Sequence, residues 1–175
     1  SHLYAIHNQI HSTGRVLRTY HPAIHLNGCG AQVRLNTIYN IPHSALELNG
    51  NDHTIDGNTF HDISWECGDC GALMMTRSFS YQGNVISNNV FRNIWSPFTK
   101  EENVRAIFMD DHASGLTIIK NYFYNCSDAI LIGGGRQNKV LYNHFHDCDT
   151  CVYMSQRGLQ EDCSASGELM KDLES

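Results

Sequence analysis

Two adjacent aspartates, Asp110 and Asp111, are the residues of this sequence best suited to chemistry. One carboxylate of such a pair can act as a general acid or base, and two together can hold a cation. An Asp-Asp pair shortly before Ala-Ser-Gly (residues 113–115) is also typical of a solvated turn. The pair therefore marks a candidate catalytic site, which the surrounding elements must support.

The segment Cys67-Gly-Asp-Cys70 has the spacing of half a zinc site. No second cysteine pair follows at matching spacing, and the surroundings are not the βαβ unit of a redox motif. A loop disulfide or two plain thiols is the favoured interpretation. The eleven histidines do not change this view, since several flank apolar strand positions where an exposed polar residue is expected. We expect no metal site and no cofactor.

Composition excludes several classes of protein. The 175 residues carry 12 Lys and Arg against 18 Asp and Glu, a formal net charge of −6, which argues against a nucleic-acid partner. No apolar run approaches the roughly 18–20 residues of a membrane-spanning helix. Seven cysteines favour an oxidising compartment, so we expect an extracellular or secretory location. A chain that starts Ser1-His2-Leu3 suggests a processed or excised segment, with further coils or domains in its parent protein.

The chain is organised as a repeat. The Asn motif, Asn-x-(Ile/Phe)-x-(Asn/Asp/Ser), starts at Asn8, Asn36, Asn58, Asn89, Asn121 and Asn143. The Ala motif, a short alternation of apolar residues, follows each copy and starts at Ala23, Ala45, Ala72, Ala106, Ala129 and Cys151. Alternation at period 2 predicts strands, and a unit of about 22 residues cannot bury its apolar face unless copies stack.

These repeats predict an all-β protein, a parallel β-helix solenoid of about six coils in which the recurring Asn forms a ladder. We expect the β-helix over residues 1–158 and a short C-terminal cap or tail over residues 159–175. A leucine-rich repeat has a similar period, but its Leu-rich pattern and single strand per repeat do not fit. Length varies mainly between the two motifs, so inserted loops should gather at one corner and form a wall beside the next strands.

The repeats resemble those of the pectin-lyase-like right-handed β-helix superfamily. Four segments are similar to a group of secreted β-helix repeat proteins: Cys70–Asn84 (CGALMMTRSFSYQGN), Ala106–Gly115 (AIFMDDHASG), Ile132–Asn138 (IGGGRQN) and Arg157–Leu159 (RGL). The resemblance implies a right-handed solenoid related to β-helical glycoside hydrolases, with polysaccharide lyases and epimerases sharing the fold. Two positions depart from the group, which tends to carry Asp at Ser155 and Tyr at Met74.

The period of the strands selects the residues that face outward. Inward Ile107 and Met109 imply outward Phe108 and Asp110. The alignment then gives an outward column that includes Glu47, Met74, Phe108 and Tyr153, on which a sugar ring could lie. Arg77, Arg136 and Arg157 follow strand ends and are suited to carboxylates or sulfates of an acidic glycan.

A glycosidase needs two carboxyl groups, about 6.5–9.5 Å apart in an inverting enzyme. Position 155 lies two coils from Asp110, so roughly 9.6 Å away at about 4.8 Å per coil, but Ser155 supplies no carboxylate. Either another acid substitutes, or the reaction has been lost; the candidate substitutes are Asp111, Asp69, Glu66 and Asp62. A lyase or epimerase would instead use Arg77, His112 or Arg136.

Together these features predict a carbohydrate-associated protein that binds a polysaccharide or oligosaccharide in a groove near residues 106–111. Glycoside hydrolase activity, intact or decayed, is one interpretation of the acidic pair. The alternatives are a non-catalytic glycan-binding or structural solenoid segment of a larger protein, and a polysaccharide lyase or epimerase.

Overall fold

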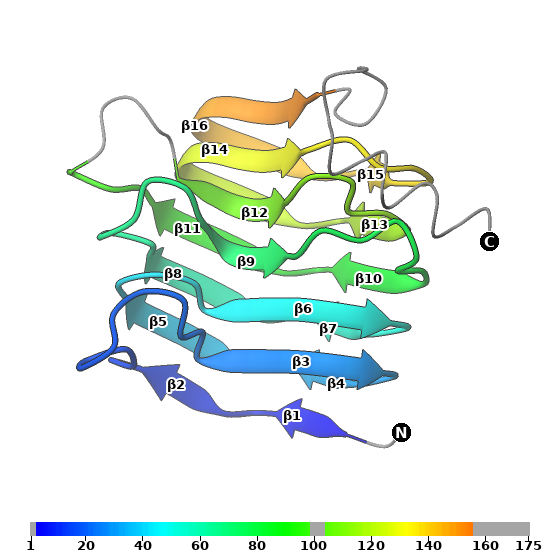
Figure 1. Cartoon of the computed structure of the whole chain (residues 1–175). Coiled ribbons are helices and arrows are strands. Elements are labelled where there is room, and N and C mark those ends of the chain that lie inside the picture. Colours follow the sequence, from blue (N-terminus) through cyan, green and yellow to red (C-terminus); the bar gives the residue numbers. More distant parts are fainter. Residues whose placement is uncertain (1–2, 99–103, 156–175) are drawn as a thin grey trace.

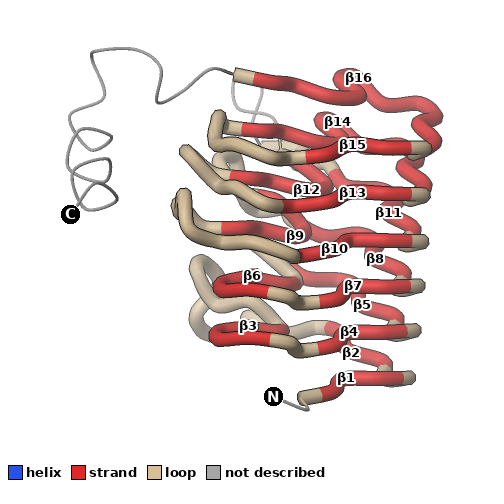
Figure 2. The backbone as a smooth tube through the Cα atoms, turned by 90° about the vertical axis from the view of Figure 1, so that its right-hand side faces the viewer, coloured by secondary structure: helices blue, strands red, loops and turns tan. Residues whose placement is uncertain are grey.

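The computed structural model describes residues 3–98 and 104–155, and Figures 1 and 2 show them as a solenoid of stacked coils. Every regular element in this part of the chain is a β-strand, and all paired strands run parallel. The chain is a right-handed parallel β-helix, as the repeats and their resemblance predict. The expected cap over residues 159–175 lies outside the described residues.

One face of the solenoid is a six-stranded sheet. Its strands, in spatial order, are β1 (Tyr4–Ile6), β4 (Gln32–Arg34), β7 (Thr54–Asp56), β10 (Asn84–Ser87), β13 (Leu116–Ile119) and β15 (Lys139–Leu141). Each coil of the solenoid contributes one strand to this sheet. The six strands therefore agree with the predicted number of coils.

The other two faces belong to one sheet that turns a corner. The Asn-motif face consists of β2 (Gln9–His11), β5 (Thr37–Ile41), β8 (Thr59–Ile63), β11 (Val90–Ile94) and the first halves of β14 (Tyr122–Ile132) and β16 (His144–Met154). The Ala-motif face consists of β3 (Ile24–Cys29), β6 (Leu46–Asn51), β9 (Gly71–Met75), β12 (Arg105–Met109) and the second halves of β14 and β16. β14 and β16 run through the corner without interruption because no loop is inserted in these two coils (Figure 1).

Apolar columns fill the interior as the repeat register predicts. Leu46, Leu73, Ile107 and Ile130 pair in register and are 0% exposed. The aromatic column stacks with ring centroids 4.8 Å apart for Phe60 and Phe91 and 5.1 Å apart for Phe91 and Phe123. Side chains of the first and last described coils are less buried, as for Met154, which is 66% exposed.

The repeated asparagines form the predicted ladder. The Nδ2 atom of Asn58 donates to Asn89 Oδ1 at 2.9 Å and to the carbonyl of Val33 in the preceding coil at 2.9 Å. Asn58 Oδ1 in turn accepts from the backbone N–H of Asn36 at 3.0 Å. The same bonds recur up the solenoid to Asn121 and Asn143. The four inner asparagines are buried, whereas Asn8 is exposed and Asn143 half-buried at the ends of the described coils.

Backbone geometry explains the last residue of the Asn motif. Ser12, Asn40, Asp62, Asn93, Asn125 and Asp147 all have φ between 50° and 56°. This left-handed conformation is easiest for Gly, Asn and Asp, and it turns each coil from the Asn-motif face toward the Ala-motif face. The inserted loops start just beyond these turns and gather at one corner, seen at the left of Figure 1.

We expect Asn121→Ala to lower the free energy of unfolding by about 1–3 kcal/mol, because the substitution leaves buried backbone groups without partners. Asn8→Ala, at the exposed end of the ladder, is the matched control and should cost much less. Chemical denaturation measures both, and equal midpoints for Asn121→Ala and wild type would contradict a stabilising ladder.

We also expect Phe123→Ala to cost about 3–5 kcal/mol, because it removes a fully buried ring between two stacked neighbours and leaves a cavity. Phe145→Ala, at the half-buried end of the column, is the comparison and should cost less. Thermal unfolding followed by circular dichroism separates the two variants.

Candidate functional site

The acidic pair lies directly after β12 and binds an arginine from the coil below. Arg77 Nε donates to Asp110 Oδ2 at 3.2 Å, and Arg77 Nη2 lies 3.4 Å from Asp111 Oδ2. Asp110 Oδ1 also accepts from the backbone N–H of Asp111 at 2.7 Å. Both carboxylates therefore share one guanidinium, whose side chain is 58% exposed.

The register of the sheet sets the position of this turn. Met109, Ile132 and Met154 pair across β12, β14 and β16. The residues that follow them therefore occupy the same position in three consecutive coils: Asp110, Gly133 and Ser155. A Cβ atom at Gly133 would lie 2.9 Å from the carbonyl oxygen of Met109 and 3.2 Å from the Asp111 nitrogen. Glycine at 133 thus lets the turn that carries Asp110 and Asp111 pack tightly on the next coil.

Polar side chains continue from this cluster down the Ala-motif face. Asn49 Nδ2 donates to Glu47 Oε1 at 2.9 Å and lies 3.2 Å from His25 Nε2. Thr76 Oγ1 donates to Asn49 Oδ1, and Thr76 is the neighbour of Arg77 in the chain. We call this set the polar row; its members are His25, Glu47, Asn49, Thr76, Arg77, Asp110 and Asp111.

We expected the Phe108 ring to be an open outward surface for a sugar, but in the structure this ring is covered. Phe108 lies outside the interior core cluster, as an outward residue should, but it is only 6% exposed. The guanidinium carbon of Arg105 lies 5.1 Å from the centre of its ring and covers it. Met74 is half-buried, with its sulfur accepting from Ser44 Oγ at 3.2 Å, while Tyr153 is 51% exposed. Of these predicted contacts, Tyr153 presents the most accessible ring.

His112 and Arg136 meet at a different aromatic residue, Phe79, which the sequence did not single out. His112 stacks on Phe79 with ring centroids 4.7 Å apart, and the Arg136 guanidinium carbon lies 5.6 Å from the same ring. His112 is only 3% exposed, so its ring is not available to a substrate in this arrangement. Arg157, the remaining predicted contact, lies outside the described residues.

The acids named above as substitutes for a carboxylate at position 155 are engaged elsewhere. Asp69 binds Arg105 Nη1 at 3.2 Å, and Glu66 binds Arg18 at the loop corner. Asp62 is on the Asn-motif face, where hydrogen bonds from His61 and Asn93 hold its pKa below the usual value although burial raises it. Asp111 shares its guanidinium with Asp110 on the same turn, so these two do not oppose each other across a groove.

The inserted loops form a depression at the corner of the solenoid, which no repeat motif marks. A cavity of about 380 Å³ is lined by Ser12, Thr13, Gly14, Arg15, Arg18, Asn40, Pro42 and Trp65. Arg18 pairs with Glu66 at 2.5 Å, and its guanidinium carbon lies 5.4 Å from the Trp65 ring. No motif marks Arg18 or Trp65, because they come from loops outside the repeat.

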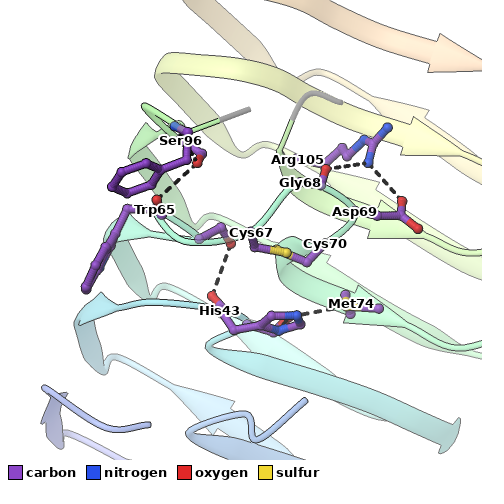
Figure 3. Close-up of a disulfide and its surroundings, with 12 residues drawn as sticks. His43, Trp65, Cys67, Gly68, Asp69, Cys70, Met74, Ser96 and Arg105 are labelled. Carbon is purple, nitrogen blue, oxygen red and sulfur yellow. Dashed lines mark hydrogen bonds and ion pairs between the residues drawn. A yellow bond between two sulfur atoms is a disulfide. The ribbon is translucent and has the colours of Figure 1, made fainter. Parts of the chain in front are cut away.

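Cys67 and Cys70 form a disulfide in the loop before β9 (Figure 3). This is the first of the two states that the sequence left open. Cys126 and Cys148 are free thiols that pair in register on β14 and β16.

Comparison with known proteins agrees with this architecture. The family described as "Right handed beta helix region" matches residues 22–168. The chain belongs to this right-handed β-helix family. A solved structure titled "Glycoside hydrolase" is similar at 15% identity and a TM-score of 0.48. That match covers 71% of this chain and 22% of the other, so the β-helix chain spans well under half of that protein's length. None of the curated proteins compared matches significantly. The described part of the chain contains no helix that is long and apolar enough to cross a membrane.

The arginine bridge should be dispensable for folding. Because its guanidinium is largely exposed, we expect Arg77→Gln to change the free energy of unfolding by about 0–1 kcal/mol. Denaturation with urea checks this value. A loss comparable to that of Phe123→Ala would instead make the bridge a structural element.

Proposed function

We propose that this β-helix protein binds a polysaccharide or oligosaccharide along the Ala-motif face and has little or no hydrolase activity. The polar row is the observation that carries the proposal. Carboxylate, amide, imidazole and guanidinium groups lie side by side across the coils of β3, β6, β9 and β12. Sugar hydroxyls both donate and accept hydrogen bonds, so such a row can contact several hydroxyls of an extended chain.

The charge of the polar row favours a neutral glycan. Glu47, Asp110 and Asp111 contribute three carboxylates, and both aspartates already occupy the guanidinium of Arg77. An acidic glycan would have to compete with them for Arg77 and approach a chain whose net charge is −6. A lyase or epimerase acting on uronates is correspondingly less well supported, since buried His112 is not presented to a substrate.

We expect weak catalysis because of the residues at positions 110 and 155, where an inverting glycosidase would carry its two carboxylates. Asp110 holds a salt bridge, and Ser155 stands where an inverting partner would be expected. The Ser155 hydroxyl is buried and has no hydrogen-bond partner within residues 3–98 and 104–155. A hydroxyl cannot replace a general acid or base that contributes about 10²–10⁴-fold to a rate.

Binding is tested on an array of neutral and uronate-containing oligosaccharides, followed by calorimetry on the best ligand. Arg77→Gln and Glu47→Gln should each weaken binding about 10- to 100-fold, the equivalent of losing a charge-assisted hydrogen bond. Arg34→Gln is the matched control, because Arg34 forms a similarly exposed pair with Asp56 at 3.0 Å on the six-stranded sheet. No binding to any glycan, or equal losses for Arg34→Gln and Arg77→Gln, would contradict the proposal.

Catalysis is tested separately on the bound oligosaccharide by measuring released reducing ends. We expect no turnover by wild type and a measurable gain for Ser155→Asp, which restores the second carboxylate. The gain should disappear when Asp110→Asn is added. Wild-type hydrolysis that survives Asp110→Asn would place the chemistry elsewhere.

A further inference from the structure

A histidine from one coil packs against the cysteine pair of the next. His43 lies in the connection between β5 and β6, and Cys67 and Cys70 lie in the loop between β8 and β9 (Figure 3). The two Sγ atoms and a ring nitrogen of His43 all lie within 4.8 Å of one another. All three residues are buried: His43 is 4% exposed, Cys67 8% and Cys70 0%.

Backbone hydrogen bonds hold these residues together independently of the disulfide. Ser64 N–H donates to the carbonyl of Ile41 at 2.9 Å, and Glu66 N–H donates to that of Pro42 at 3.0 Å. Ser64 Oγ donates to the His43 carbonyl itself at 3.1 Å. Between the two cysteines, the Arg105 side chain donates from Nη1 to the Gly68 carbonyl at 3.4 Å. Reduction of the disulfide therefore leaves His43 and the cysteine loop in place.

The Ser44 hydroxyl lies where it can set the tautomer of the His43 ring. Ser44 Oγ is 3.2 Å from His43 Nδ1 and donates to Met74 Sδ at 3.2 Å. With the hydroxyl hydrogen on Met74, Ser44 Oγ accepts from a protonated Nδ1, and Nε2 keeps the lone pair that a metal needs.

We propose that the reduced form of this cluster binds a zinc ion through Cys67 Sγ, Cys70 Sγ and His43 Nε2. The Cys-x-x-Cys spacing and the Cys/His ligand set are those of zinc sites. A thiol reductant of the glutathione class breaks the Sγ–Sγ bond: two reductant thiols become a disulfide, and the protein gains two thiols. Zinc then displaces the two thiol protons. Zinc binding and disulfide formation exclude each other, because both use the same sulfur atoms.

Zinc alone is the probe for the intact chain. Reduced wild type should bind one zinc ion in competition with a chromogenic chelator, and the oxidised protein should not bind it at this site. His43→Gln should weaken binding by tenfold or more, since even supporting residues of metal sites contribute about 10–100-fold. Cys67→Ser should do the same. The matched controls are His53→Gln, which changes another buried histidine, and Cys126→Ser, which changes another buried thiol. Both variants should retain zinc.

Wild type alone provides a second measurement that does not depend on the folding of variants. Zinc should slow alkylation of Cys67 and Cys70 in the reduced protein, while exposed Cys29 and Cys151 react at unchanged rates. Absence of zinc binding by the reduced chain, unchanged alkylation of the pair, or full zinc affinity in folded His43→Gln would each overturn the proposal. Glycan binding does not enter any of these readouts.

Discussion

The hydrogen-bonded column of asparagines is the constraint on which the rest of the structure depends. Each inner asparagine side chain bonds to the coils on either side of its own. A shift of one coil relative to its neighbours would therefore break several buried hydrogen bonds at once. The ladder thereby fixes the register of the parallel strands, and the register brings Phe91 and Phe123 face to face inside. Apolar burial supplies much of the stability, but it does not by itself select which residues pair.

The same register determines what chemistry the outer faces can perform. Residues at matching repeat positions in neighbouring coils are separated by the distance between two coils. The backbone positions of Asp110 and Ser155 are therefore two coils apart, whatever side chains they carry. A catalytic pair in this frame needs carboxylates at both positions, with side chains that a substrate can reach. Position 155 carries serine, so the pair considered above is incomplete in this chain.

Much of the molecule follows from the sequence because the repeat is local and periodic. The Asn ladder and the inward-facing apolar positions can be read from spacing and residue type. Long side chains and inserted loops cannot be read in this way. Arg105 covers Phe108, and Arg77, two residues after β9, contacts both aspartates. These flexible side chains contact neighbours that the repeat does not specify.

The loop before β9 shows how such non-repeating contacts can matter. The sequence favours a disulfide or two plain thiols at Cys67 and Cys70, although their spacing resembles half of a zinc site. The third ligand of the proposed zinc site, His43, lies 24 residues before Cys67 in the connection of a neighbouring coil. Strand β9 then runs from Gly71, next to this cluster, to Met75, next to Thr76 and Arg77 of the polar row. Met74 contacts Ser44 from the middle of that strand. A single strand of five residues therefore separates the cysteine pair from Thr76 and Arg77 of the polar row.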